Sequence, residues 1–154
     1  MDMMTALALT VGVLVAVFVK LASTMSMLWY VGAIGWACFI AAGGKVQGLK
    51  QASVAGLGGM FWVAIAEASS FVSGHMEMEW LLLGAAGFLI VFQARLRLFS
   101  FIPAGLCGAA VIGAGGPIGI FDAVTNLRLA IAFVLGTIIG LIAEMIAGML
   151  AKKA

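Results

Sequence analysis

The chain has 154 residues, of which 65% are hydrophobic and only 9% are charged, and its mean hydropathy is +1.26. A soluble domain carries about 25% charged residues, so this composition excludes a water-soluble globular protein and predicts an integral membrane protein whose partner is the lipid bilayer. The formal net charge is only +2 and no basic run occurs, so nothing indicates nucleic-acid binding.

Six apolar runs follow one another along the chain. A transmembrane helix needs about 20 apolar residues, and fewer where it is short or broken. We therefore expect six transmembrane helices, over residues 3–22, 28–44, 52–72, 80–94, 98–115 and 127–151. The polar segments 45–51 and 73–79 should form loops. The first run has no basic segment before it and carries Lys20 where a signal peptide would be cleaved, so we expect it to stay as a helix.

The basic residues predict the orientation of these helices. If both termini are cytoplasmic, the inward-facing segments contain Lys45, Lys50, Arg95, Arg97, Lys152 and Lys153, and the outward-facing segments contain only Lys20 and Arg128. Cytoplasmic segments of membrane proteins carry the excess of Lys and Arg. The pattern therefore predicts a multi-pass protein with its N- and C-termini in the cytoplasm.

The sequence contains an internal repeat. Residues 32–44 can be laid on residues 104–116 without a gap, and Ile65-Ala66-Glu67 resembles Ile142-Ala143-Glu144. Chance is the alternative, because helices rich in Ala and Gly align easily. We expect an all-α membrane protein, a single transmembrane domain with one three-helix repeat at about 3–72 and a second at about 80–151. An odd number of helices in each repeat places the second repeat upside down in the bilayer.

Glycines mark where the helices should pack closely. The second and fifth runs are short and end in diglycines, Gly43-Gly44 and Gly115-Gly116. Interrupted helices at matching positions of two inverted repeats indicate a solute site. In the last run Gly136 and Gly140 are spaced by four residues, a spacing of small residues that lets helices approach each other.

Two acids lie inside apolar runs, Glu67 and Glu144. A carboxylate at membrane depth costs about 2.5–3.5 kcal/mol, so it normally faces protein or water. Glu144 follows Gly140 by four residues and should face the bundle, and Glu67 should share a buried face with Met60, Val63 and Ser70. The two acids should lie near opposite membrane surfaces, either beside a solute pathway or as proton sites. The alternative is a structural role as hydrogen-bond acceptors.

Other side chains are candidates for lining the pathway. Trp36 and Phe39 lie deep in the second run, with core packing as their alternative role, and Phe101, Pro103 and Gly108 belong to the fifth run. The chain has one histidine and two cysteines, with no metal-ligand spacing and no nucleophile–base pair. We therefore expect no metal, no cofactor and no enzymatic activity.

Two motifs carry a resemblance to a known family. They are Trp36-Ala37-Cys38-Phe39 with Gly43-Gly44, and the segment 99–105 with Gly108. With these motifs the chain resembles the DUF1097 family of bacterial inner-membrane proteins, over most of its length. The resemblance implies a small multi-pass protein of the bacterial inner membrane and implies no substrate.

The function that we expect is transport of a small molecule. Glycine makes up 21 of 154 residues, about twice the average usage, which is typical of tightly packed helices around a narrow path. Because few fixed charges are available for an ion-selective pore, we expect a channel or facilitator for a small neutral polar solute of the urea or amide class, with its path at the interface of the repeats. A proton-coupled transporter that uses Glu67 or Glu144, and a non-transporting accessory or assembly subunit, are the alternatives. A homo-oligomer is expected because six short helices leave much apolar surface for neighbours.

Overall fold

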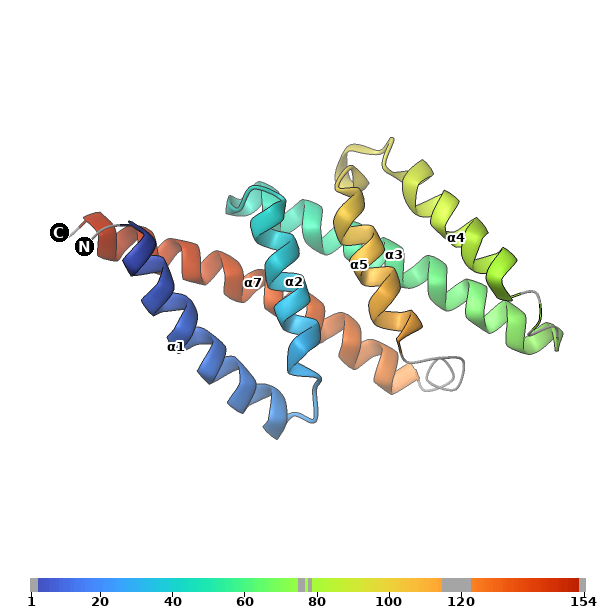
Figure 1. Ribbon diagram of the computed structural model, residues 1–154, viewed down its shortest axis with the longest axis horizontal. Helices are drawn as coiled ribbons and strands as arrows, with labels where there is room; N and C mark the ends of the chain where they lie inside the picture. The colour runs from blue at the N-terminus through green and yellow to red at the C-terminus, as the bar shows by residue number, and fades with distance from the viewer. Residues whose placement is uncertain (1–2, 75–76, 78, 115–122, 153–154) are drawn as a thin grey trace.

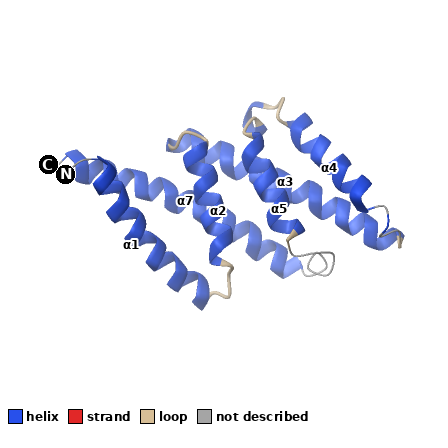
Figure 2. Ribbon diagram, in the orientation of Figure 1, coloured by secondary structure: helices blue, strands red, loops and turns tan. Residues whose placement is uncertain are grey.

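The computed structural model is all-helical over the residues that it describes, which are 3–74, 77, 79–114 and 123–152. Six α-helices occur in this part of the chain: α1 (Met3–Thr24), α2 (Trp29–Ala41), α3 (Lys45–Ser73), α4 (Glu79–Gln93), α5 (Ile102–Gly113) and α7 (Ala123–Lys152). A 3-10 turn, η2 (Arg97–Phe99), lies between α4 and α5 (Figure 2). The prediction of an all-α protein is confirmed.

The helices fall into a long and a short class. Three are long and apolar enough to cross a membrane, over Met4–Thr24, Lys45–Ser73 and Val124–Ala151. The other apolar helices, α2, α4 and α5, have 13, 15 and 12 residues. At a rise of 1.5 Å per residue α2 is about 20 Å long, whereas the hydrocarbon core of a bilayer is about 30 Å thick. The short second and fifth helices expected from the sequence are therefore present.

The expected loop at residues 45–51 is wrong, because these residues form the first two turns of α3. A loop was expected because Lys45, Gln47 and Lys50 interrupt the apolar sequence. In the structure these three side chains are exposed, whereas Gly48 and Ala52 on the other face are buried. Lys and Gln are good helix formers, so the helix continues here with one polar face.

Two other helix starts also differ from the expected runs. The last helix begins at Ala123, four residues before the expected start at 127. The fifth begins at Ile102 instead of 98. Pro103 explains the later start, because proline fits the first turn of a helix but clashes with the preceding turn when it lies further inside.

The shorter helices of each half of the chain pack mainly on the long helix of the other half. α2 lies mainly against α7, and α5 lies mainly against α3. The first helix of each half follows the same pattern, because α1 packs on α7 and α4 packs on α3 (Figure 1). The long helices α3 and α7 also contact each other, and they form the centre of the molecule.

Glycines form the closest contacts in the pair of α2 with α7 and in the pair of α5 with α3. Where α2 meets α7, a Cβ added to Gly136 would overlap the backbone carbonyl of Gly32. Where α3 meets α5, a Cβ on Gly59 would overlap the carbonyl of Gly105, and a Cβ on Gly108 would overlap that of Gly56. The backbones therefore touch at both crossings, as in other membrane helices that pack through small residues.

The contact between α3 and α7 is filled by side chains. Phe133 and Thr137 are fully buried, and the Phe133 ring lies against Gly56. The hydroxyls of Ser53 and Thr137 are 2.8 Å apart. Because Thr137 donates its own proton to the carbonyl of Val134 at 2.7 Å, Ser53 must donate to Thr137. The centre of the molecule is thus closely packed and carries one hydroxyl pair.

The outer surface of the bundle is apolar. Large hydrophobic side chains such as Val13, Phe61, Trp80, Phe88 and Met145 are more than half exposed. Soluble monomers do not expose contiguous apolar surface on this scale. The surface of the bundle therefore suits lipid.

Candidate functional site

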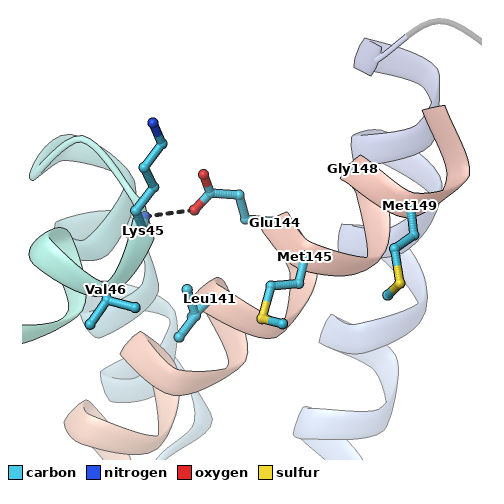
Figure 3. Close-up of a pocket in the computed structure, with 7 residues that line it drawn as sticks. All are labelled: Lys45, Val46, Leu141, Glu144, Met145, Gly148 and Met149. Atoms are coloured by element: carbon cyan, nitrogen blue, oxygen red, sulfur yellow. Dashed lines mark hydrogen bonds between the residues drawn. The ribbon is translucent and has the colours of Figure 1, made fainter. Parts of the chain in front are cut away.

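Glu144 lies beside the sharp turn between α2 and α3. Gly43, Gly44 and Lys45 have φ values of 89°, 68° and 57°, in the left-handed region that glycine adopts without strain. The backbone N–H of Lys45 donates to Oε2 of Glu144 at 2.7 Å. Figure 3 shows one carboxylate oxygen directed at this nitrogen, with the Lys45 side chain extending upward beside the carboxylate. The turn therefore presents a backbone donor to an acid that lies 99 positions further along the chain.

This contact gives Glu144 a structural role. The first four N–H groups of a helix have no partner within the helix, and the N-cap residue Gly44 has no side chain that accepts one. The carboxylate supplies an acceptor, and a negative charge is favourable at a helix N-terminus. Glu144 thereby joins the beginning of α3 to the last third of α7.

Two pockets adjoin Glu144. The pocket of Figure 3 has a volume of about 450 Å³ and is lined by Lys45, Val46, Leu141, Glu144, Met145, Gly148 and Met149. The second pocket, which we name the Glu144 cleft, has a volume of about 330 Å³ and is lined by Leu7, Trp36, Phe39, Ile40, Gly43, Gly44, Gly140, Ala143 and Glu144. The Glu144 cleft thus brings together six of the residues that the sequence singled out for the pathway or for packing.

Gly140 makes room for the aromatic rings of the cleft. A Cβ added to Gly140 would lie 2.6 Å from the ring of Phe39 and 2.7 Å from that of Trp36. Both rings are largely buried yet line the cleft. Trp36 and Phe39 therefore take part in the packing of α2 on α7 and also shape the cavity.

Glu67 occupies a different place, near the other end of the fold. It is only 2% exposed, and its Oε2 has no hydrogen-bond partner within the described part of the chain. Its Oε1 lies 3.6 Å from the position of a Cβ on Gly113, at the end of α5. Glu67 follows Lys45 by 22 residues, which is about 33 Å along α3. The two acids therefore do not share a site.

The buried face expected around Glu67 is present. Met60, Val63, Glu67 and Ser70 are all buried on α3. A buried carboxylate oxygen without a hydrogen bond is costly. The diglycine Gly115-Gly116, expected near this end, lies outside the described residues, as does His75.

The remaining candidate residues of the fifth helix lie apart from both acids. Phe101 is half-buried just before α5, and Pro103 is exposed in its first turn. Gly108 lies in the crossing with α3, against Gly56. Their contacts are those of a helix start and of a helix crossing, and none of the three lines the Glu144 cleft.

Metal ligands do not gather in the part of the chain that the structure describes. No group of three His, Cys, Asp or Glu side chains there could hold a metal ion. Cys38 and Cys107 are free thiols on α2 and α5, and both side chains belong to the same packed core cluster. They therefore serve as small residues at a contact between the two halves.

Sequence reasoning missed the aliphatic residues Leu7 and Ile40 of the cleft, and the backbone donor of Lys45 beside it. Leu7 was not singled out, because one aliphatic residue in an apolar helix carries no signal of its own. The Lys45 N–H was missed because the segment 45–51 was expected to be a loop. The diglycine before Lys45 was the available signal, since it predicts a turn in which backbone donors are left unpaired.

The chain is similar to membrane proteins of unknown function. The family model described as "Protein of unknown function (DUF1097)" matches residues 8–148. "Inner membrane protein YcdZ" of Escherichia coli (strain K12) is 27% identical over 117 residues, which cover 75% of this chain and 72% of the relative. "Inner membrane protein YcdZ" of Salmonella typhimurium (strain LT2) is 29% identical over 75% of this chain and 73% of the relative.

A third relative has no assigned role in its name. "Uncharacterized protein YahC" of Escherichia coli (strain K12) is 30% identical over 128 residues, which cover 75% of this chain and 78% of the relative. No solved structure matches the chain. Together with the three long apolar helices, these likenesses identify a membrane protein.

Proposed function

Because the chain belongs to the DUF1097 family of proteins of unknown function, we propose its function from its own geometry: it is a facilitator for a small polar solute in the bacterial inner membrane. The facilitator consists of two inverted three-helix repeats with both termini in the cytoplasm. The names of two relatives, both inner membrane proteins, support the location. The homo-oligomer expected from the sequence remains a prediction.

The arrangement of the helices supports the inverted repeat. In Figure 1 a half-turn about the line of sight carries α1 approximately onto α4, α2 onto α5 and α3 onto α7. The same half-turn places the pair of α2 and α7 on the pair of α5 and α3, and these are the two pairs with the most extensive packing. Corresponding helices run in opposite directions, as an inverted repeat requires.

The glycine contacts support the same correspondence residue by residue. Gly32 and Gly105 are 73 positions apart, and Gly59 and Gly136 are 77 positions apart. The contact of Gly32 with Gly136 therefore corresponds to the contact of Gly105 with Gly59. The second shift also relates Glu67 to Glu144, as the sequence overlay did. For α2 and α5 the contacts favour a shift of 73 residues over the 72 of the gapless overlay, which is a rotation of about 100° on a helix.

The distribution of basic residues supports the orientation. Lys45 and Lys50 lie in the first turns of α3, and Arg95 and Arg97 lie between α4 and α5. In Figure 1 both places lie along the upper edge of the molecule, while the connection between α1 and α2, just after Lys20, lies along the lower edge. The basic excess at one edge favours a cytoplasmic location for that edge.

The Glu144 cleft is the observation that carries the proposed function. It is a cavity at one end of α3 that joins an acid to two aromatic rings in an otherwise apolar bundle, and a second acid lies near the other end of α3. Cavities of this kind at the interface of inverted repeats typically bind solutes. Because Phe133 and Thr137 fill the contact between α3 and α7, passage requires a rearrangement of the two repeats, so we propose a facilitator and not a permanently open pore.

Osmotic measurements test this function. Proteoliposomes of purified protein are compared with protein-free liposomes by stopped-flow light scattering, with urea, acetamide, glycerol and methylammonium as solutes. We expect faster entry of at least one solute. Gly140→Val should abolish the increase by filling the cleft, while the matched change Gly87→Val, at a site with open space beside it, should retain it. If no solute enters faster than in protein-free liposomes, the accessory or assembly role is favoured.

Proton coupling is a second candidate, and Glu67 favours it. A buried carboxylate with an oxygen that has no partner among the described residues is a typical proton site in transporters. Solute accumulation that an imposed pH gradient drives, and that Glu67→Gln abolishes, would support coupling. Entry that merely equilibrates at every pH supports the facilitator.

A further inference from the structure

We propose that the Glu144 cleft binds a small organic ammonium ion, such as a short primary alkylammonium. This inference rests on the proposed function, because it names the solute class for the same cavity. It differs from the neutral solute that the scarcity of charge suggests. The chain has only six acidic residues, and one of them lies in this cavity beside two aromatic rings.

The charge of the cleft favours a cation. Glu144 is the one charged side chain among the described residues that line it. Its Oε2 accepts the Lys45 N–H, which leaves Oε1 as an acceptor for a ligand. The exposed Lys45 side chain lines the neighbouring pocket and is not among the residues that line the cleft. On the side of the cleft the carboxylate has apolar and aromatic neighbours, and no basic side chain is among the described residues that line it. It therefore attracts a cation more strongly there than a carboxylate in open water does, because the local dielectric constant is lower.

The aromatic rings and the size of the cleft favour an organic cation. Trp36 and Phe39 offer aromatic rings to an ammonium group, and Trp is the best of the aromatic residues for this interaction. Leu7 and Ile40 add apolar surface for a short alkyl chain. The volume of about 330 Å³ is at the lower end of the range for small-molecule pockets, about 300–1,000 Å³. The ligand must therefore be small.

The other end of the fold shows that helix packing does not require these rings. The shifts of 73 and 77 positions relate Trp36 and Phe39 to Ala109 and Ile112, and Gly140 to Val63. Near Glu67 aliphatic side chains therefore take the positions that the two rings and Gly140 occupy near Glu144. The aromatic pair is a special feature of the Glu144 cleft, and recognition of an organic cation accounts for it.

Isothermal titration tests the proposal on the full-length protein in detergent, with ethylammonium chloride as the probe and acetamide as its neutral counterpart, at constant ionic strength. We expect ethylammonium to bind and acetamide to bind at least about tenfold more weakly. Glu144→Gln should weaken ethylammonium about tenfold, and Trp36→Leu about threefold through loss of the cation–π contact. Glu77→Gln removes an exposed carboxylate and should leave the affinity unchanged.

Circular dichroism melts verify that each variant is folded, and Trp36→Leu keeps the test decisive if Glu144→Gln does not fold. Equal affinity of the wild type and a folded Glu144→Gln or Trp36→Leu would overturn the proposal, and so would acetamide that binds as tightly as ethylammonium. Entry of urea into proteoliposomes without ethylammonium binding would overturn this inference alone and leave the proposed function standing.

A lipid headgroup carries the same chemistry as a free amine. Nanodiscs of phosphatidylethanolamine and of phosphatidylglycerol distinguish the two sources. Equal ethylammonium affinity in both supports a free amine as the ligand. A lower ethylammonium affinity in phosphatidylethanolamine nanodiscs means that the lipid headgroup competes for the cleft. That result also supports recognition of an ammonium group, with the lipid as its source.

Discussion

Gly59 and Gly105 set the distance between α3 and α5, because a side chain on Gly59 would overlap the backbone carbonyl of Gly105. We predict that Gly59→Ala destabilises the protein by about 1–3 kcal/mol, the usual cost of overpacking a tight contact. The free energy of unfolding can be measured by circular dichroism in mixed micelles of dodecyl maltoside and sodium dodecyl sulfate.

A glycine of α4 supplies the matched control. Gly84 has open space where its Cβ would lie, so Gly84→Ala should leave the stability unchanged or raise it by up to about 1 kcal/mol through better helix propensity. Equal effects of the two substitutions would show that α3 and α5 do not touch at Gly59.

Individual residues were predictable where helix periodicity decides their direction. The four-residue spacing placed Gly136, Gly140 and Glu144 on one face, and all three lie at contacts with the turn of Gly44 or with α2. The partner of Glu144 was not predictable. The Lys45 N–H reaches the carboxylate because three successive residues adopt positive φ. The diglycine predicts a turn here, but it does not specify which distant acid the turn will meet.

At the scale of the elements, the contact of α3 with α7 depends on the hydroxyl pair of Ser53 and Thr137, 2.8 Å apart. We predict that a double-mutant cycle with Ser53→Ala and Thr137→Val gives a coupling energy of about 0.6 kcal/mol, and up to about 1.7 kcal/mol, the range known for hydrogen bonds between membrane helices. The same unfolding measurement provides it. A coupling energy of zero would show that the two hydroxyls do not interact, and would contradict the contact of α3 with α7 at these residues.

The helices themselves were largely predictable, but their ends were not. Apolar runs located the six helices because burial and contact with lipid both require apolar residues. The start of α3 was missed because an amphipathic turn at a membrane surface resembles a loop in hydropathy. The start of α5 was placed too early, because Leu98, Phe99 and Phe101 are apolar although Pro103 limits how far the helix extends toward them.

At the scale of the whole molecule, the exchange of partners between the halves was not predictable. The sequence suggested a repeat through its diglycines and its two acids, but the glycine contacts favour a shift of 73 residues for α2 and α5 over the 72 of the gapless overlay. Hydropathy, however, does not tell which apolar helix packs on which. The pairing of α2 with α7 and of α5 with α3 depends on backbone contacts at glycines from distant parts of the sequence.

The opposite orientation of the two halves is the central claim, and cysteine labelling tests it most directly. Met25 follows α1 and Leu96 follows α4, and both side chains are exposed. Single cysteines are placed at these two sites in a Cys38→Ala/Cys107→Ala background and treated with a membrane-impermeant maleimide in spheroplasts and in inverted vesicles. We predict labelling of Met25→Cys only from the periplasmic side and of Leu96→Cys only from the cytoplasmic side. Labelling of both from the same side would contradict the inverted repeat.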